Sequence, residues 1–340
     1  MIIASEQELE ELLSRPSKAD VEFSATLSGP LIILGAGGKM GPTLARRAKR
    51  AAEEAGVEQR VIAVSRYSTE SAREKLEQWG VETISADLLD REQLALLPDA
   101  PNVIYMAARK FGSTGSEYLT WGMNAWLPGI VAERYRHSRI VAMSSGNIYP
   151  FVPVASGGAT ESTPLASVGE YGQSVLARER IFEFFSIRYG TPVVNVRLNY
   201  AVELRYGVLV DIGMAVFERR PVDLTMGSAN VIWQGDANSV VLRSLALCSS
   251  PAAALNLTGP ETLSVRYVAQ RFGQHFGVEP MLTGEEAPTA LLNNAAKCHR
   301  IFGYPSVTPD QMIEWIAGWI GMGGANLGKP TKFAVRDGKF

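Results

Sequence analysis

Residues 31–41 read Leu-Ile-Ile-Leu-Gly-Ala-Gly-Gly-Lys-Met-Gly, an apolar run that passes directly into a glycine-rich loop. The Ala- and Arg-rich stretch 40–56 follows and predicts a helix. Glycines at such a turn let backbone N–H groups approach a pyrophosphate, and the helix N-terminus adds partial positive charge. The spacing of Gly35, Gly38 and Gly41 therefore predicts a dinucleotide-binding turn. The alternative is a glycine-rich turn that serves packing alone.

Apolar strands and helices alternate through the first two hundred residues. Strands are expected at 31–35, 60–65, 81–87, 102–108, 139–145 and 192–198, and helices at 71–80, 116–137 and 170–189. Near-continuous apolar strands indicate a sheet buried on both faces, hence a parallel sheet with crossover helices. The predicted fold class is α/β, a Rossmann-type doubly wound parallel sheet with a smaller, mostly helical C-terminal substrate lobe.

The chain divides into four expected regions. Residues 1–28 form an N-terminal helical appendage, and 29–200 form the NAD(P)-binding domain, to which a strand near 254–259 returns. Residues 201–320 form a substrate-binding lobe. The tail, 321–340, is Gly-rich and then basic, and it is either mobile or folded back over a cleft.

Composition narrows the function classes. The 340 residues carry a formal net charge of −2, which argues against a nucleic-acid binder. Two cysteines and three histidines have no spacing that suits a metal site. The N-terminus does not resemble a signal peptide and no apolar run is long enough to span a membrane, so we expect a cytoplasmic protein. The basic cluster of Arg46, Arg47, Lys49 and Arg50 is expected to be a solvated helix face rather than a phosphate site.

The end of the second strand bears on the choice of cofactor. An NAD site usually has an acidic residue there, which bonds the ribose 2′-hydroxyl. This chain has Ser65 and Arg66 instead, a pair suited to a 2′-phosphate. We therefore expect NADP to be favoured over NAD; in the alternative, Arg66 points into solvent.

Further motifs occur in an order that resembles the extended short-chain dehydrogenase/reductase family, the NAD-dependent epimerase/dehydratase group that acts on sugars and nucleotide sugars. The resemblance covers roughly residues 30–320. Besides the glycine loop, the matching segments are Asp87-Leu88, Ala107-Ala108, Asn124, Ser144-Ser145-Gly-Asn-Ile-Tyr149, Tyr171-Gly-Gln-Ser-Val175, Arg197-Leu-Asn199-Tyr200, Asn230 to Asp236, Asn256-Leu-Thr-Gly259 and Ser264-Val265.

The resemblance implies roles for these residues. Ser145, Tyr171 and Asn124 would be catalytic: Ser145 by polarising the reacting oxygen, Tyr171 by moving its proton, and Asn124 by organising a water or the helix backbone. The alternative for Asn124 is a packing role. Substrate contacts are expected from Asn147, Asn199 and Arg205 on cleft loops. The expected cofactor-binding set comprises Gly35, Gly38, Lys39, Met40, Gly41, Ser65, Arg66, Asp87, Leu88, Met106, Ala107, Ala108, Lys110, Ser144, Tyr171 and Leu198.

One position departs from the family pattern. Val175 stands where the family's motif has a lysine, which bonds the nicotinamide ribose and lowers the tyrosine pKa. An ordinary tyrosine, with a pKa of about 10, is a poor base at neutral pH. Arg109, Lys110, Arg178 or the tail lysines would supply a replacement cation. Otherwise the standard chemistry is lost or a different reaction takes its place.

The resemblance implies an NAD(P)-dependent oxidoreductase or epimerase that acts on a sugar, sugar acid or nucleotide sugar at a hydroxyl-bearing carbon. Dehydration is disfavoured because Gly146 and Asn147 follow Ser145, where a dehydratase has an acid/base pair. The alternative is a catalytically altered NAD(P)-binding regulator or partner protein of the same fold. A homodimer is expected through helices 116–137 and 170–189, because both are rich in apolar residues.

Overall fold

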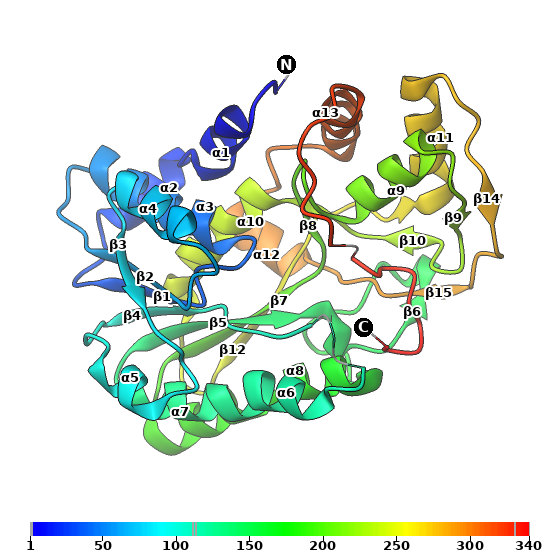
Figure 1. Cartoon of the computed structure of the whole chain (residues 1–340). Helices are drawn as coiled ribbons and strands as arrows, with labels where there is room; N and C mark the ends of the chain where they lie inside the picture. Colours follow the sequence, from blue (N-terminus) through cyan, green and yellow to red (C-terminus); the bar gives the residue numbers. More distant parts are fainter. Residues whose placement is uncertain (1–2, 111, 113, 330, 340) are drawn as a thin grey trace.

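The computed structural model describes residues 3–110, 112, 114–329 and 331–339. Its centre is a seven-stranded sheet in the order β12-β7-β5-β4-β1-β2-β3, in which every neighbouring pair is parallel (Figure 1). The predicted α/β class is therefore confirmed. The strands of this sheet are β1 (Leu31–Leu34), β2 (Val61–Ser65), β3 (Glu82–Ser85), β4 (Asn102–Tyr105), β5 (Arg139–Ser145), β7 (Val193–Leu198) and β12 (Ala253–Leu257).

Alternate residues of each central strand enter two separate apolar layers, because successive side chains of a strand point to opposite faces. Leu31 and Ile33 pack on one side of the sheet, and Ile32 and Leu34 pack on the other. Figure 1 shows helices above and below the sheet. The upper layer includes α3 (Gly41–Glu54), α4 (Glu70–Gln78) and α10 (Gln234–Arg243), and the lower layer includes α5 (Arg91–Leu96), α6 (Glu117–Trp121), α7 (Leu127–Arg134) and α8 (Gly169–Tyr189).

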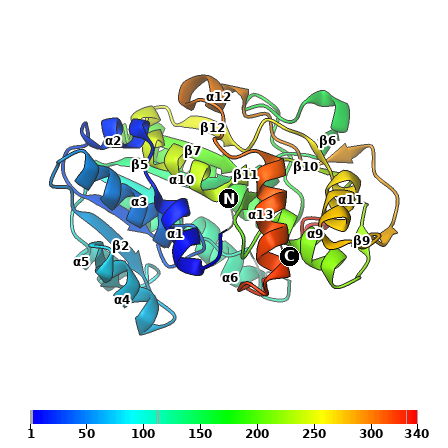
Figure 2. The same cartoon turned by 90° about the horizontal axis from the view of Figure 1, so that it is seen from above.

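The chain between β7 and the tail builds a second apolar cluster beside the carboxyl end of the sheet (Figure 2). Its main helices are α9 (Val208–Phe217), α11 (Val265–Phe276) and α13 (Pro309–Gly321), and Leu9 and Leu13 of the N-terminal segment join them. Short strand pairs surround them, namely β8 (Ala201–Val202) with β11 (Ile232–Trp233), β9 (Val222–Asp223) with β14 (Leu282–Thr283), β10 (Ser228–Ala229) with β13 (Leu263–Ser264), and β6 (Val152–Pro153) with β15 (Thr289–Ala290). Helix α12 (Ala296–Phe302) packs beside β12.

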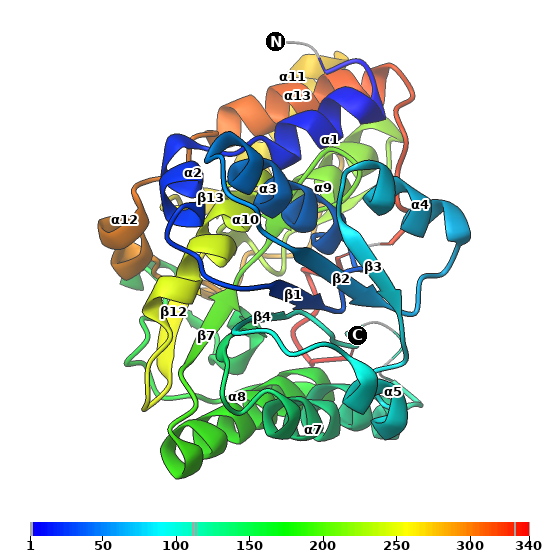
Figure 3. The same cartoon turned by 90° about the vertical axis from the view of Figure 1, so that its left-hand side faces the viewer.

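Two N-terminal helices lie against α3 (Figure 3): α1 (Glu6–Ser14) and α2 (Lys18–Ser24). The sequence does not predict α2, because its seven residues lack an apolar stripe. Its Asp20 is fully buried and accepts hydrogen bonds from Arg47 Nε and Nη2 at 2.9 and 2.6 Å. Arg50 likewise pairs with Glu11 of α1, at 2.9 Å. The expectation of a solvated basic face is therefore wrong for these arginines, because they anchor the N-terminal helices.

The predicted helix 116–137 is interrupted. A π-helical segment, η1 (Gly122–Trp126), separates α6 from α7, and Asn124 within it is fully buried. Such segments frequently occur at functional sites because they re-aim a side chain. Within the described part of the chain, no helix is both long and apolar enough to cross a membrane.

Candidate active site at the carboxyl end of the sheet

A cavity of about 280 Å³ opens where β1, β4, β5 and β7 end, next to the helical lobe. The order of the sheet reverses between β1 and β4, and crevices at such switch points are where α/β proteins bind ligands. The glycine loop forms one wall of the cavity. Gly35, Gly38 and Gly41 line it next to the N-terminus of α3, together with Lys39 and Met40.

Two of these glycines are sterically required. Gly35 has φ +88°, and a Cβ there would lie 2.6 Å from the backbone nitrogen of Ala107. A Cβ at Gly41 would lie 2.2 Å from the carbonyl oxygen of Ala36. The loop therefore folds tightly between β1 and β4. It leaves a cradle that fits a dinucleotide pyrophosphate, which would bind the backbone N–H groups at the start of α3.

The structure brings together most of the sequence-predicted site residues. Those lining the cavity are Gly35, Gly38, Lys39, Met40, Gly41, Met106, Ala108, Lys110, Ser144, Ser145, Asn147, Tyr171, Leu198 and Asn199. Six expected contacts and one expected catalytic residue lie outside it, namely Ser65, Arg66, Asp87, Leu88, Ala107, Arg205 and Asn124. Sequence reasoning did not assign Tyr200, Tyr206, Gln234 or Thr331, which also line the wall.

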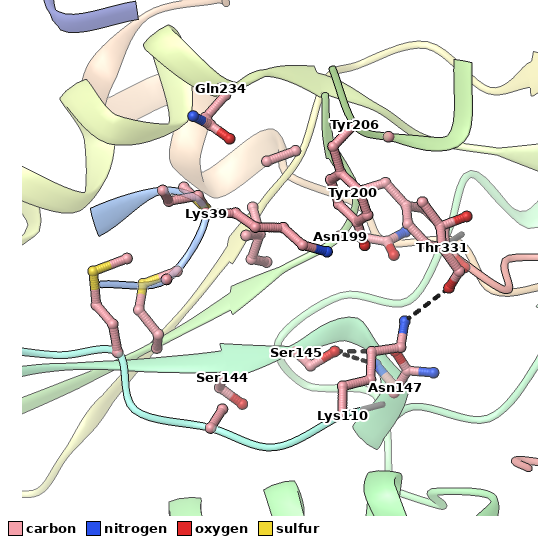
Figure 4. A pocket seen from close by; sticks show the side chains of 18 of the residues that line it. Lys39, Lys110, Ser144, Ser145, Asn147, Asn199, Tyr200, Tyr206, Gln234 and Thr331 are labelled. Atoms are coloured by element: carbon pink, nitrogen blue, oxygen red, sulfur yellow. Dashed lines mark hydrogen bonds between the residues drawn. The ribbon is translucent and has the colours of Figure 1, made fainter. Parts of the chain in front are cut away.

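Ser145 and Tyr171 come from β5 and α8 and meet in the cavity. The Ser145 hydroxyl donates to Asn147 Oδ1 at 3.1 Å and accepts from the Asn147 backbone nitrogen at 3.2 Å (Figure 4). Burial raises the pKa of Tyr171 above its ordinary value, while the positive charge of Arg178 and a hydrogen bond with Ser145 oppose that rise. The two hydroxyls thus form a linked pair that can donate hydrogen bonds to a substrate oxygen.

Arg178 lies beneath this pair and is only 2 % exposed. Its Nη1 donates to the Met143 carbonyl oxygen at 2.7 Å, and its Nη2 donates to Asn124 Oδ1, also at 2.7 Å. The Asn124 amide in turn donates to Ser174 Oγ of α8 at 3.0 Å. Asn124 therefore holds Arg178 and α8 in place by hydrogen bonds. The π-helical segment directs the Asn124 side chain toward these partners.

The side chains of two lysines line the cavity, one from the glycine loop and one from the segment after β4. Lys39, in the glycine loop, places Nζ 3.1 Å from the centroid of the Tyr206 ring. Lys110 follows β4, and its Nζ lies 5.7 Å from the centroid of the Tyr171 ring. Burial, together with the positive charges of Lys329 and Lys110, lowers the pKa of Lys39 to about 7, and burial with the charge of Lys332 lowers the pKa of Lys110 to about 8.

The C-terminal tail folds back over this site (Figure 1). Thr331 lines the cavity, and its backbone nitrogen and Oγ1 donate to Asp211 Oδ2 at 2.8 and 2.5 Å. The Thr331 carbonyl oxygen accepts from Lys110 Nζ at 3.4 Å. Farther along, Arg336 donates to the Thr289 carbonyl oxygen at 2.9 Å. Of the two expectations for the tail, folding back is the one that the structure shows.

The remaining predicted residues are placed elsewhere. Arg66 is exposed at the end of β2, with Nη1 3.7 Å from Asp87 Oδ2. Arg205 faces Glu203, Glu6 and Glu10 instead of the cavity. This set of carboxylates ties Arg205 to α1, so its contribution is to the packing of the N-terminal segment.

Comparison with known proteins decides the family. A sequence model described as "NAD dependent epimerase/dehydratase family" matches residues 31–202, just over half of the chain. The chain belongs to this family. Among curated proteins, none matches it. Members of the family use a nicotinamide dinucleotide, which agrees with the fit of the glycine loop.

Solved structures share the fold of this family member at low sequence identity. Pal from Bacillus thuringiensis has a TM-score of 0.71 at 16% identity, over 86% of this chain and 99% of that one. UDP-glucuronic acid 4-epimerase from Bacillus cereus, in complex with a UDP-sugar and NAD, has a TM-score of 0.70 at 14% identity, over 86% and 99%. The dTDP-glucose 4,6-dehydratase of Bacillus anthracis, in complex with NAD, has a TM-score of 0.72 at 15% identity, over 87% and 97%.

Proposed function

We propose that the protein is an NAD(P)-dependent oxidoreductase or epimerase that acts at a hydroxyl-bearing carbon of a sugar, sugar acid or nucleotide sugar. The observation that carries this proposal is the meeting of Ser145 and Tyr171 in the cavity whose other wall is the glycine loop. Neither the loop nor the hydroxyl pair would suffice alone. Together they set a proton-transferring group beside the space in which a nicotinamide ring would lie.

A bound nicotinamide cofactor would supply the acceptor or donor for a hydride at the substrate carbon. The residues expected to hold it are the glycine loop, Met106, Ala108, Ser144 and Leu198. Ser145 donates a hydrogen bond to the reacting oxygen and stabilises the negative charge that develops there. Tyr171 takes the hydroxyl proton during oxidation and gives it back during reduction. Asn147 orients the Ser145 hydroxyl, and Asn199 lines the substrate side.

We further propose that this chain lacks the lysine of the family motif and that Arg178 supplies the positive charge near Tyr171 in its place. Val175, four residues after Tyr171, is fully buried in an apolar cluster and carries no charge. Arg178 lies one helical turn farther along and lines the same cavity, and its charge opposes the burial that raises the pKa of Tyr171. On this proposal Asn124 is a positioning residue that acts through Arg178.

Replacing Arg178 with methionine should shift the pH profile of oxidation. Without the nearby positive charge the pKa of Tyr171 rises, so less tyrosinate is present at any given pH. We expect the rising limb of kcat/KM to move to higher pH, and the rate near neutral pH to fall about tenfold for each pH unit of that shift. Arg178→Lys should restore part of the rate, and Arg180→Met, on the exposed face of the same helix, should leave the profile unchanged. If the rising limb of the kcat/KM profile were not shifted in Arg178→Met, a group other than Arg178 would influence the pKa of Tyr171.

The choice between NAD and NADP belongs to the same proposal. Ser65 and Arg66 favour NADP, because no carboxylate follows β2 directly. Asp87 lies near Arg66, however, and would compete with a 2′-phosphate for its guanidinium. The preference is tested by measuring the dissociation constants of both cofactors for the wild type and for Arg66→Ala. NADP preference requires that the variant lose affinity for NADPH alone.

Val175 also supports a second candidate, a cofactor-binding regulator or partner protein without turnover. The experiment that separates the two is a panel of hexoses, hexuronates, hexose phosphates and nucleotide sugars, assayed for reduction of NAD and NADP by absorbance. Turnover of a panel member by wild type supports the enzyme. Tight cofactor binding with no turnover of any member supports the regulator.

We also propose a homodimer through α6, η1, α7 and α8. Tyr118, Trp126, Phe184 and Ile187 are each more than half exposed there. The N-terminal helices pack against α3 on the other side of the sheet and leave this face open. Trp126→Glu should yield a monomer in sedimentation velocity, because a charge would be buried in the interface. Leu96→Glu, at an exposed apolar residue of α5, should remain dimeric. A monomeric wild-type protein would refute the proposal.

A further inference from the structure

A second cavity, of about 440 Å³, lies next to the first one, between α9 and the C-terminal tail. Tyr206 lines both cavities, and Asp211 of α9 lines the second. The tail takes part in both walls, because Thr331 lines the first cavity and the next residues, Lys332 and Phe333, line the second. Tyr206, Asp211 and Thr331 therefore form a partition between the two cavities.

Thr331 is the tail residue of this partition, and it is only 2 % exposed. Its backbone nitrogen and its hydroxyl both donate to Asp211, and its carbonyl oxygen accepts from Lys110 Nζ, as Figure 4 shows for the last of these bonds. Asp211 belongs to the helical lobe, whereas Lys110 follows β4 of the sheet. Thr331 thus joins the two halves of the molecule at the side of the cavity where a substrate would lie.

Farther along, the tail is fixed at two more points. Arg336 donates to the Thr289 carbonyl oxygen at 2.9 Å and to Thr289 Oγ1 at 2.8 Å. Gly338 packs backbone against backbone on Gly169, where a Cβ on Gly338 would lie 2.6 Å from the Gly169 Cα. Gly169 is two residues before Tyr171. The tail is therefore packed into the site at both of its ends, and its course is set by contacts that a bulkier residue would break.

The partition leaves little room for a substrate. The first cavity measures about 280 Å³, whereas pockets for drug-sized ligands run from about 300 to about 1,000 Å³. This cavity would also have to hold the nicotinamide end of the cofactor, beside Ser145 and Tyr171. The remaining space suits a ligand of monosaccharide size. A larger group attached to the sugar, on the side away from the glycine loop, would meet the partition.

We propose that Thr331, and the tail that carries it, determine substrate specificity by excluding the nucleotide of a nucleotide sugar. The substrate is then a free monosaccharide or a sugar acid. This inference rests on the function proposed above and narrows its substrate class. Release of the tail would join the two cavities and admit the larger ligand.

Calorimetric titration of the full chain loaded with NADH tests the inference. The probes are glucose, galactose and glucuronate, each compared with its UDP derivative. For the wild type we expect at least one free sugar to bind at least about tenfold more tightly than its UDP derivative, because specificity is the difference between the two binding free energies.

A shortened chain that ends at Asn326 removes the partition. It lacks Thr331 but keeps the hydrogen bond from Trp319 Nε1 to the Ala325 carbonyl oxygen, at 2.9 Å, which holds the end of the last helix. The ratio of the two affinities should move by at least about tenfold toward the UDP derivative. Circular dichroism checks that the shortened chain is folded.

A point variant tests the same step without removing any residue. Gly338→Val places a side chain against the backbone of Gly169 and should release the tail, with the same shift in the affinity ratio. Lys339→Met is the matched control, because it breaks only an exposed pair with Asp337, and it should leave the ratio at the wild-type value. A shift in either folded variant supports the inference.

Three results would overturn it: wild-type binding of a UDP derivative as tight as that of the free sugar, wild-type binding of no free sugar, or an unchanged ratio in both variants. Turnover of a UDP-sugar by the wild type would also overturn it and would still support the proposed function. Tail-dependent selection of the free sugar without turnover of any sugar in the panel would refute the proposed function alone.

Discussion

Tyr171→Phe should lower kcat by about a thousandfold, because the change removes the group that exchanges a proton with the substrate oxygen. The variant retains the ring that lines the cavity and loses only the hydroxyl. Cofactor affinity should therefore change little, and the fold should be intact. Stopped-flow absorbance of the reduced cofactor, with the substrate identified in the sugar panel, measures the effect.

Tyr118→Phe is the matched control, since Tyr118 is 75% exposed on α6 and lies outside the cavity. It should turn over at the wild-type rate. Survival of substantial turnover in Tyr171→Phe would show that another group moves the proton, and the assignment of Tyr171 would be wrong. Lys110 would then be the first group to examine, because its Nζ is close to the same ring.

Asp20→Ala should lower the free energy of unfolding by about 3–5 kcal/mol, because it leaves the buried Arg47 and the partly buried Arg243 without their anion. Asp20 is fully buried, bonds Arg47 twice, and lies 3.3 Å from Arg243 Nε. It also accepts from Ser239 Oγ of α10, at 2.6 Å. The carboxylate thus joins α2, α3 and α10. Urea denaturation followed by circular dichroism measures the loss.

Acid should mimic this substitution. Burial by itself raises the pKa of Asp20, but the charge of Arg47 and the hydrogen bonds from Ser239 and Ser17 outweigh it and hold the pKa below its ordinary value. The stabilisation is therefore present above the unfolded pKa of about 4 and is lost as the pH falls through the folded value. Glu22→Ala, which breaks only an exposed pair with Lys18, should cost less than about 1 kcal/mol. Equal effects of the two variants would mean that α2 is not anchored by Asp20.

Local patterns made the sheet and the glycine loop predictable. Each apolar strand and its following helix can be read from adjacent residues, and the carboxyl ends of parallel strands necessarily meet at one edge. The glycine loop and Ser145, at the ends of two such strands, could therefore be placed at one edge of the sheet, whereas the roles of Ser145 and Tyr171 came from the resemblance to the epimerase/dehydratase family. The interruption at Asn124 was not predicted, because nothing in the local sequence distinguishes a π-helical turn from the α-helix around it.

Contacts between distant segments could not be predicted. Asp211 and Thr331 are 120 residues apart, and their pairing depends on how the tail crosses the helical lobe. Arg47 could be identified as basic, but its buried partner Asp20 lies in a short helix without an apolar stripe. Arg205 was expected at the substrate because it is polar and follows a predicted cleft loop, whereas three carboxylates hold it away from the cavity.

Fluorescence titration of NADH and NADPH into cofactor-free protein tests the central claim most directly, because cofactor binding at the glycine loop precedes every step proposed for Ser145 and Tyr171. We expect at least one of the two to bind with micromolar affinity. We also expect Gly38→Val, which puts a branched side chain into the cradle, to abolish that binding. Binding of neither cofactor by the folded wild-type protein would contradict the account.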